Sequence, residues 1–423
     1  MNLKTRVRSA LMNYFSSTAY QQRQQRRGRR TRPKAGAVVH YFHQPDDPYS
    51  HLAIQKLDGL RDQYNVGFRV HLVSSADAAF QGSATHYPAW AYRDAQQVAD
   101  AYDTRFAPSA TPTPETTLAA ARALSAQVER EDFATQAVEI GTALWGGELN
   151  PQAGADLTPF VAGNTLREKL GHYGGAMFYF EGEWYWGLDR SRYLEHRLCA
   201  EGFSRTDAIQ IPQPQPEGDF GPRARDLTLE YFPSLRSPYT AVGHARVLAL
   251  IEASGVQLNL RPVMPMMMRG IPAPRAKQRY IITDAGREAR TFGVPFSQVV
   301  DPFGEPVRRA FALFPGAVAL GRGMEFVTSY LHAAWADDTD ITKESGLEQV
   351  ARNAGLEFAE LKRAAQGQDW EGLLESNLQA MLAEDLWGVP SFKVTGGDRP
   401  DFACWGQDRI WRVAQEIIDR SGA

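Results

Sequence analysis

The chain has 423 residues, 43% of them hydrophobic and 11% aromatic, which is enough to fill two sizeable cores and predicts a globular protein. No run of eighteen apolar residues occurs, which excludes a membrane-spanning helix. The net charge of −3 is unevenly spread, because residues 1–36 carry ten Lys or Arg and no acid and the remainder therefore sums to −13.

Residues 1–36 predict a basic, partly disordered arm, with a run of arginines at positions 23, 26, 27, 29, 30 and 32. Such a run suits nucleic acid, anionic lipid or an acidic partner, and an Arg-rich, acid-poor segment also fits a transit peptide. No apolar stretch of the secretory type follows it. Outside the arm, the acidic body argues against binding to nucleic acid.

Residues 37–203 predict a first α/β domain. Its elements, in chain order, are a strand at 37–42, a helix at 49–64, a strand at 66–73, a helix-rich section at 89–170, a hairpin at 176–180 and 184–186, and a helix from 189. The first three elements form a β-α-β unit, whose strands are expected to be parallel.

Residues 204–225 predict a linker, because prolines at 212, 214 and 216 favour an extended spacer and forbid a helix. Residues 226–423 repeat the order of the first domain. We expect a strand at 227–232, a helix from 238, a strand at 257–263, helices to 386, a hairpin at 391–394 and 402–405, and a helix from 408.

Several residue pairs share an offset of 190 along the chain: Tyr41 and Tyr231, Pro48 and Pro238, Asp94 and Asp284, Trp145 and Trp335. Such a constant offset indicates a tandem repeat. The two copies differ where this architecture would do its chemistry. The first has Asp47 and Ala176, and the second has Ser237 and Pro390. The sequence therefore predicts one active half and one degenerate half.

The order of elements is that of a thioredoxin fold with an inserted helical domain, and three motifs narrow the resemblance. They are Ser237-Pro238-Tyr239-Thr240, Trp387-Gly388-Val389-Pro390-Ser391-Phe392 and Phe402-Ala403-Cys404-Trp405-Gly406-Gln407-Asp408-Arg409. Residues 226–420 resemble the DsbA-like superfamily, and within it the branch of 2-hydroxychromene-2-carboxylate isomerase and kappa-class glutathione transferase. The expected fold class is thus α/β, with two tandem thioredoxin-like domains that each contain a helical insertion.

Ser237 precedes a proline, so it stands where the N-cap of a helix belongs. A helix N-terminus favours an anion such as a thiolate. The resemblance implies that Ser237 activates the sulfur of bound glutathione and that Val389 and a cis Pro390 pair with the tripeptide backbone. It further implies that Gln407 and Asp408 hold its γ-glutamyl end, although simple capping of the last helix explains these two equally well.

Residues 264–272 depart from the resembled branch, which has a longer loop with a basic residue and an asparagine. Arg269 is the candidate for the basic contact, and the asparagine has no counterpart. Glutathione as the cofactor is therefore an open question. His40 and His43 stand three apart on a strand and point to opposite faces, and no ligand spacing indicates a metal site.

The leading hypothesis is a glutathione-dependent isomerase or transferase acting on a small unsaturated or aromatic-derived compound. The alternative is a non-catalytic thioredoxin-fold binding or scaffold protein. A disulfide oxidoreductase does not fit, because Ser237 and Thr240 stand where its two cysteines would be. Cys199 and Cys404, far apart in sequence, favour a reducing, cytoplasmic compartment over a disulfide scaffold. The repeat favours a monomeric pseudo-dimer or a homodimer.

Overall fold

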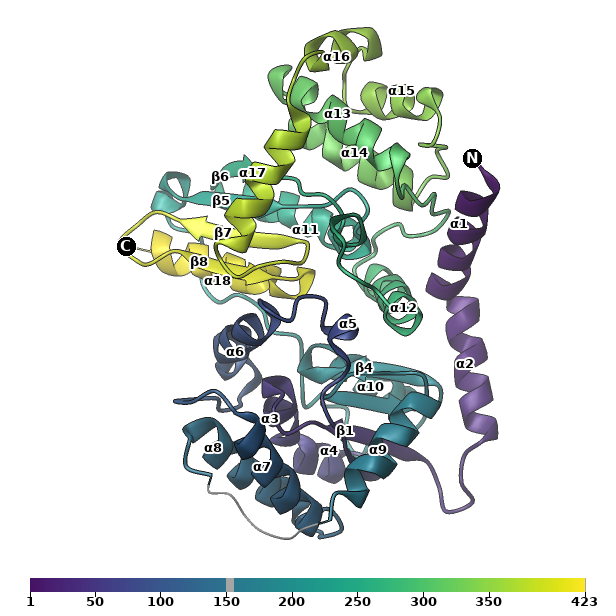
Figure 1. Cartoon of the computed structure of the whole chain (residues 1–423), viewed down its shortest axis with the longest axis vertical. Helices are drawn as coiled ribbons and strands as arrows, with labels where there is room; N and C mark the ends of the chain where they lie inside the picture. Colours follow the sequence, from purple (N-terminus) through teal and green to yellow (C-terminus); the bar gives the residue numbers. More distant parts are fainter. Residues whose placement is uncertain (150–155, 423) are drawn as a thin grey trace. The chain divides into compact units, whose positions relative to one another are not determined.

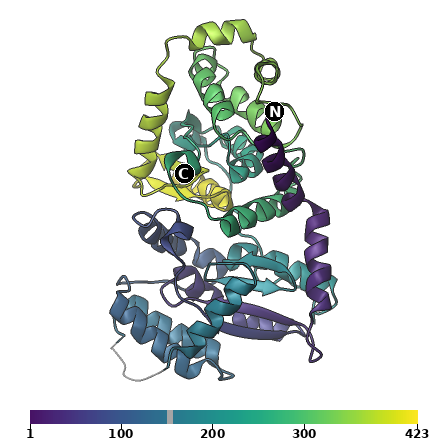
Figure 2. The ribbon, with the colours of Figure 1, turned by 45° about the vertical axis from the view of Figure 1, so that its right-hand side comes forward.

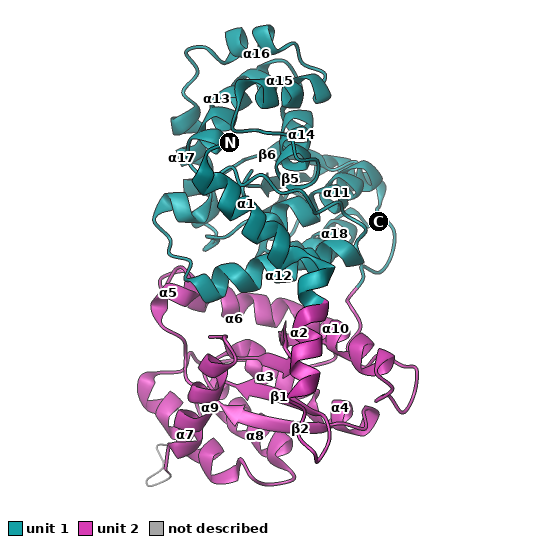
Figure 3. Cartoon of the chain, turned by 90° about the vertical axis from the view of Figure 1, so that its right-hand side faces the viewer, with its two compact units in different colours: residues 1–21, 215–423 teal, residues 22–214 magenta. Residues whose placement is uncertain are grey.

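The computed structural model describes residues 1–149 and 156–422. Two compact units divide the chain (Figure 3). Unit 1 comprises residues 1–21 and 215–423, and unit 2 comprises residues 22–214. Each unit contains one four-stranded mixed sheet with helices packed on it (Figure 1). The boundary at residues 214 and 215 lies inside the Pro-rich segment that the sequence predicts as a linker.

The sheet of unit 2 has the strand order β2-β1-β3-β4. Its strands are β1 (Val38–His43), β2 (Gly67–Leu72), β3 (Met177–Phe180) and β4 (Glu183–Trp186). β1 is parallel to β2 and antiparallel to β3, and β3 and β4 form an antiparallel hairpin. Fully buried aromatic side chains of β1 and β3, among them Tyr41 and Phe178, place the central strands in the core.

Helices lie between the strands of unit 2 and after its last strand. They are α3 (Pro48–Ile54), α4 (Leu57–Gln63), α5 (Ala78–Gln81), α6 (Tyr87–Val98), α7 (Pro114–Gln127), α8 (Phe133–Gly146), α9 (Thr158–Lys169) and α10 (Gly187–Ala200), with a 3-10 turn η1 (Asp100–Tyr102). The expected single helix at 49–64 is wrong, since α3 and α4 are separate. The Gln55 side chain at this break exchanges two hydrogen bonds with the Arg105 backbone, 2.8 and 2.9 Å long, and so is fixed by a tertiary contact.

The sheet of unit 1 has the order β6-β5-β7-β8. Its strands are β5 (Thr228–Phe232), β6 (Gln257–Leu260), β7 (Ser391–Thr395) and β8 (Phe402–Trp405). β5 is parallel to β6 and antiparallel to β7, and β7 and β8 form a hairpin. β6 ends earlier than expected, shortly before Pro262, which has no N–H to donate to a ladder.

The remaining elements of unit 1 follow the same plan. They are α11 (Pro238–Ser254), α12 (Arg275–Thr291), α13 (Glu305–Ala319), α14 (Gly323–Trp335), α15 (Glu344–Asn353), α16 (Phe358–Ala365), α17 (Trp370–Leu382) and α18 (Ile410–Ser421), with 3-10 turns η2 (Pro222–Asp226), η3 (Met266–Arg269) and η4 (Gln407–Arg409). One apolar core lies among α13, α14 and α15, and a second lies between the sheet and α18. The last helix begins at Ile410, two residues later than expected, because the 3-10 turn η4 precedes it.

The pairing registers of the two sheets correspond residue by residue. Tyr41 lies opposite Val70 and Phe178, and Tyr231 lies opposite Leu260 and Phe392. The partners Val70 and Leu260 keep the offset of 190 found in the sequence. Strand order, strand direction and register thus agree between the units.

The expectation of a partly disordered arm at residues 1–36 is wrong, because the structure has two helices there. α1 (Leu3–Ser16) and α2 (Thr18–Arg30) occupy most of it. α1 contacts α12 of unit 1, and Figure 2 shows it in dark purple against the green helices. Ser16 lies so close to Gly286 that a Cβ there would be 2.4 Å from the Ser16 carbonyl oxygen. Tertiary packing supplies the order that composition alone does not predict.

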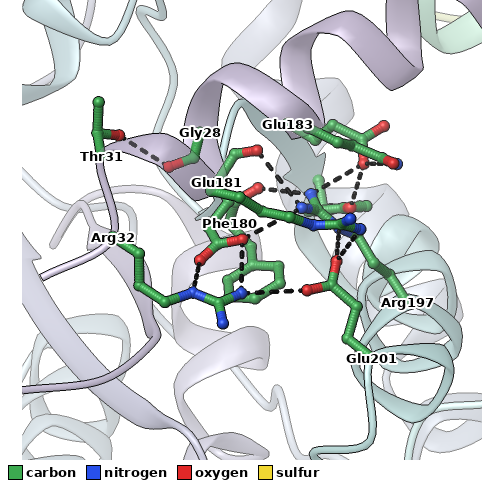
Figure 4. Close-up of polar contacts among 11 residues, drawn as sticks. Gly28, Thr31, Arg32, Phe180, Glu181, Glu183, Arg197 and Glu201 are labelled. Carbon is green, nitrogen blue, oxygen red and sulfur yellow. Dashed lines mark hydrogen bonds and ion pairs between the residues drawn. The ribbon is translucent and has the colours of Figure 1, made fainter. Parts of the chain in front are cut away.

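α2 continues into unit 2, where Arg29 of the helix and Arg32 just beyond it have acidic partners, and Figure 4 shows those of Arg32. Arg32 Nη2 donates to Glu181 and Glu201 at 3.0 and 3.2 Å, and Arg29 Nη2 donates to Glu201 at 2.9 Å. Arg197 joins the same network through a 2.9 Å bond to Glu201. A Cβ on Gly28 would lie 2.1 Å from the Glu181 carbonyl carbon, so glycine permits this close approach. Part of the basic run therefore has its acidic partner within the chain. None of the helices in the described residues is long and apolar enough to cross a membrane.

Candidate functional site

The N-terminus of α11 begins as the sequence predicts. Ser237 has an extended backbone and is the N-cap, and Pro238 occupies the first helical turn. The Ser237 Oγ accepts a hydrogen bond from the Thr240 backbone N–H at 3.1 Å. The loop before it is held by Arg236, whose Nε donates to the buried Asp301 at 2.7 Å. A hydroxyl is therefore fixed at the positive end of a 17-residue helix.

The Val389–Pro390 peptide bond is cis, which confirms the expectation drawn from the resemblance. The Ser237 hydroxyl donates to the Val389 carbonyl oxygen at 3.3 Å, so the two anchors of the expected site lie in contact. The Pro390 carbonyl oxygen accepts from the Gly406 N–H at 2.9 Å, which ties this turn to the start of η4. Local sequence fixes the N-cap, and the tertiary fold brings the residues 152 positions apart together.

Two cationic side chains lie beside the segment that leads to the cis bond. Arg269 Nη2 donates to the Trp387 carbonyl oxygen at 2.7 Å, and burial lowers the pKa of Arg269 to about 10. The Arg269 Nε has no hydrogen-bond partner among the described residues. The Lys277 Nζ lies 5.7 Å from the centre of the Trp387 ring, and burial lowers its pKa to about 8. Sequence reasoning selected Arg269 and missed Lys277, which lies in the first turn of α12.

Gln407 and Asp408 lie in η4, directly before α18. The Gln407 Nε2 donates to Glu288 at 2.8 Å and to Asp408 at 2.6 Å, and its Oε1 accepts from Arg246. Gln407 is fully buried and packs against Gly243, where a Cβ would lie 2.9 Å from its own. Its amide is thus engaged by protein groups, which favours the structural explanation of this residue over ligand binding.

The equivalent corner of unit 2 has a carboxylate and a hydroxyl instead. Asp47 is the N-cap of α3 and accepts from the Ser50 N–H at 3.0 Å and the Ser50 hydroxyl at 2.7 Å. The Ser50 Oγ in turn accepts from the backbone N–H groups of Gln44 and Ala176, at 3.2 and 2.8 Å. Burial raises the pKa of Asp47 to about 6. Ala176 has a φ of 50° and supplies an N–H that the proline in unit 1 lacks.

Two histidines stand near the first strand of unit 2. The His43 Nδ1 lies 3.3 Å from the Tyr41 hydroxyl, and burial lowers the pKa of His43 to about 3. His40 instead faces His71, with Nδ1 and Nε2 2.8 Å apart. His40 and His43 thus have separate partners. Within residues 1–149 and 156–422, no group of three or more potential ligands is placed to hold a metal ion.

Neither cysteine belongs to the start of α11. Cys404 is buried in β8 and Cys199 lies in α10 of unit 2, and neither forms a disulfide within the described residues. Ser237 and Thr240 stand at the first turn of the helix. A dithiol exchange reaction needs a reactive thiolate at such a position, so this corner has no redox centre of its own.

Comparison with known proteins identifies the class of the second half of the chain. Residues 228–418 match the family model described as a DSBA-like thioredoxin domain. This part of unit 1 is therefore a DsbA-like thioredoxin domain, which agrees with the resemblance read from the motifs. A search of curated proteins found no match.

Solved structures of the same class are similar at low identity. A structure of 2-hydroxychromene-2-carboxylate isomerase is 17% identical, with a TM-score of 0.36, over 45% of this chain and 94% of that one. A putative protein disulfide isomerase from Nitrosomonas europaea is 12% identical, with a TM-score of 0.38, over 47% and 99%. The cytosolic disulfide reductase DsbM from Pseudomonas aeruginosa is 21% identical, with a TM-score of 0.35, over 45% and 97%. TM-scores this low support no statement about activity.

Proposed function

We propose that unit 1 is a glutathione-dependent isomerase or transferase that acts on a small unsaturated or aromatic-derived compound. The observation that carries this proposal is the contact between the Ser237 hydroxyl and the Val389 carbonyl of the cis turn. A bound thiol at the N-terminus of α11 would meet a hydroxyl donor and a helix dipole, and an extended peptide would find the backbone of Val389 beside it.

The magnitudes suffice for thiol activation. Lowering a thiol pKa by about two units requires roughly 2.7 kcal/mol. A hydrogen bond to a charged group contributes roughly 1.5–3 kcal/mol, and a helix N-terminus contributes roughly 0.3–1 kcal/mol. Ser237 would rotate its O–H from the Val389 carbonyl to the sulfur. Arg269 and Lys277 add positive charge near the same turn, which favours the bound tripeptide, an anion at neutral pH.

In the isomerase form of the reaction, the thiolate adds to the β-carbon of an unsaturated carbonyl compound. The C=C π electrons move to the carbonyl oxygen as an enolate, and the new single bond allows rotation. Collapse of the enolate re-forms the double bond and expels the thiolate, so no oxidant or reductant is consumed. In the transferase form, the sulfur remains bonded to the product, and the enolate takes up at its α-carbon the proton that the thiol released. Both forms keep the role of Ser237 as donor to the sulfur.

We further propose that the chain is an internal duplication, with unit 2 as a degenerate thioredoxin-like copy and the whole chain as a monomeric pseudo-dimer. Equal strand order, equal register and the offset of 190 support this. The two free cysteines suit a reducing, cytoplasmic compartment, where glutathione is abundant. Light scattering of the full chain tests the assembly, and a homodimer is the other state that the repeat allows.

A second candidate is a non-catalytic binding or scaffold protein with a thioredoxin fold. The commitment of the Gln407 amide to Glu288 favours it, because the expected γ-glutamyl contact is then missing. The difference between residues 264–272 and the resembled branch also favours the non-catalytic candidate, since no asparagine is present there. Binding of glutathione without turnover of any conjugate would support this candidate.

The deciding experiment measures the thermal stability of the full chain with and without glutathione. Ligand at 100 times its dissociation constant should add about 2.7 kcal/mol, which at roughly 2–4 °C per kcal/mol corresponds to a rise in melting temperature of roughly 5–11 °C for a domain of this size. Ser237→Ala should reduce the rise. Ser329→Ala is the matched control, because Ser329 is also a buried serine of unit 1 that donates to a backbone carbonyl, at 2.9 Å. Absence of any rise in the unsubstituted protein would contradict the proposal.

A further inference from the structure

Helix α1 presents its large apolar side chains outward. Leu3, Val7, Leu11 and Tyr14 recur every three or four residues and therefore share one face of the helix. Their exposed fractions are 75%, 51%, 48% and 40%. Single exposed apolar residues are ordinary on protein surfaces, but four in a row along one helix face form a continuous stripe. We call these four residues the outer stripe.

The opposite face of α1 is mostly polar and is the face that packs on unit 1. Thr5, Ser9 and Ser16 are buried. Ser9 Oγ accepts from the Asp301 N–H at 3.0 Å, and Asn13 accepts from the Val299 N–H at 2.7 Å.

Further contacts hold the start of the helix. The terminal ammonium of Met1 lies 3.0 Å from Asp340, and Arg8 Nε lies 2.7 Å from Asp301. Met12 and Phe15 add partly buried apolar contacts on the inner side. Specific bonds therefore fix the orientation of α1, and rotating the outer stripe inward would break them.

The outer stripe thus points away from the core, although Met12 and Phe15 pack inward, whereas an ordinary surface helix turns its apolar residues toward the core. Leaving the outer stripe in water forgoes hydrophobic stabilisation, so the arrangement indicates a surface that is covered by something outside the unit. Lys4 and Arg6 are exposed and flank the stripe. Residues 1–36 contain no acid, and exposed arginines of α2, such as Arg26 and Arg27, extend the positive charge along the chain.

We propose that α1 is a docking surface for an anionic lipid bilayer, with the outer stripe inserted among the acyl chains and the basic residues at the headgroups. An apolar face bordered by Lys and Arg is the pattern of a helix that lies in the membrane interface. Nucleic acid offers nothing for Leu3, Val7 and Leu11 to bury against. A second copy docked on the same face would bring two segments that each carry Lys4 and Arg6 and no acid side by side, so like charges would be brought together.

The test is co-sedimentation of the full chain with phosphatidylcholine vesicles that contain or lack phosphatidylserine. We expect binding that depends on phosphatidylserine and weakens as salt is raised. The variant Leu3→Gln/Val7→Gln/Leu11→Gln should lose at least about tenfold in affinity, because the buried apolar area is removed. Lys4→Gln/Arg6→Gln should lose about fivefold for each charge.

Matched controls come from exposed residues elsewhere in unit 1. Val318→Gln replaces a valine that is 51% exposed on α13, and Lys362→Gln/Arg363→Gln removes two charges from exposed positions on α16. Both controls should bind vesicles like the unsubstituted protein, and circular dichroism should show all variants folded. No sedimentation with anionic vesicles, or equal losses in stripe and control variants, would overturn the proposal. A dimer seen by light scattering and abolished by the stripe variant, without vesicle binding, would assign the surface to a second copy.

Discussion

The two units build the same corner from different chemistry. In unit 1, a small hydroxyl at Ser237 caps the first helix and touches the carbonyl of a cis X-Pro turn. In unit 2, the carboxylate of Asp47 caps the helix, and Ser50 bonds the backbone N–H of Ala176. Unit 1 thus leaves a neutral donor at a positive helix end. Unit 2 fills the equivalent place with a buried acid that would repel a thiolate.

The comparison shows that the same arrangement of strands can place a neutral hydroxyl at the start of its first helix or fill that place with a buried polar cluster. The Ser50 hydroxyl makes three hydrogen bonds within unit 2, to the Asp47 carboxylate and to the backbone N–H groups of Gln44 and Ala176. Burial in unit 2 also shifts the pKa values of Asp47 and of several histidines away from their ordinary values. Each of the following predictions changes one half of this comparison.

Acidification should destabilise unit 2 more than unit 1, and this is the largest effect expected. The pKa values of four histidines of unit 2 are lowered by burial to about 3 or 4: His40, His43, His51 and His71. Unit 1 has His244, whose pKa falls to about 4 by burial. Because the unfolded chain takes up these protons first, stability is lost as the pH falls from about 6.5 towards 4, by about 1–2 kcal/mol for each histidine after allowance for screening.

Asp47 acts in the opposite direction over part of this range. Its pKa is raised to about 6, so the folded unit binds a proton that the unfolded chain releases, and stability from this group rises as the pH falls from about 6 to 4. The histidines outnumber it, and a net loss remains. Hydrogen exchange of the full chain at pH 7 and pH 5 should show β1 losing more protection than β5. Equal losses in the two strands would break the comparison.

Ser50→Ala should cost about 3 kcal/mol of unfolding free energy in unit 2. The change leaves two backbone N–H groups without their acceptor and takes the donor at 2.7 Å away from Asp47. The counterpart in unit 1 is Thr240→Val, which removes one bond of 3.3 Å to the Ser234 N–H and should cost about 1 kcal/mol. Urea unfolding followed by hydrogen exchange assigns each loss to its unit. Similar losses of unfolding free energy in the two variants would mean that Ser50 stabilises unit 2 no more than Thr240 stabilises unit 1.

Ser237→Ala should lower any glutathione-dependent turnover by about 10- to 100-fold, the equivalent of one hydrogen bond to a charged sulfur. Asp47→Ala should leave turnover nearly unchanged, because the proposed chemistry belongs to unit 1. Kinetics with glutathione and an unsaturated carbonyl compound provide the measurement, and Ser329→Ala serves as control. Equal losses from the Ser237 and Asp47 substitutions would show that both halves are catalytic.

The smallest effect concerns a feature that both units keep. The Tyr49 hydroxyl donates to Asp94 at 2.6 Å, and the Tyr239 hydroxyl donates to Asp284 at 2.9 Å. Tyr49→Phe and Tyr239→Phe should each cost about 1 kcal/mol, and the double variant should show the sum of both. Thermal melts of the three variants check this. A loss of stability in only one of the two single variants would show that the Tyr–Asp hydrogen bond stabilises only that unit.

The sequence by itself determined the features that depend on neighbouring residues. The N-cap at Ser237, the two hairpins and the β-α-β units follow from local patterns, since caps, turns and side-chain alternation act over a few positions. The cis turn at Val389–Pro390 came from a resemblance, because nothing local to an X-Pro bond fixes its isomer.

The tertiary structure decided the features that depend on residues far apart in the chain. The Gln407 amide donates to Glu288, 119 positions away, a partner that no local pattern predicts. Lys277 joins the site only because α12 packs beside Trp387. The order of α1 and its outward apolar face arise from bonds to Asp301 and Val299, nearly 300 positions on. Composition and periodicity indicate which residues prefer burial, but the partners that fix a polar group or cover an apolar one are set by packing in three dimensions.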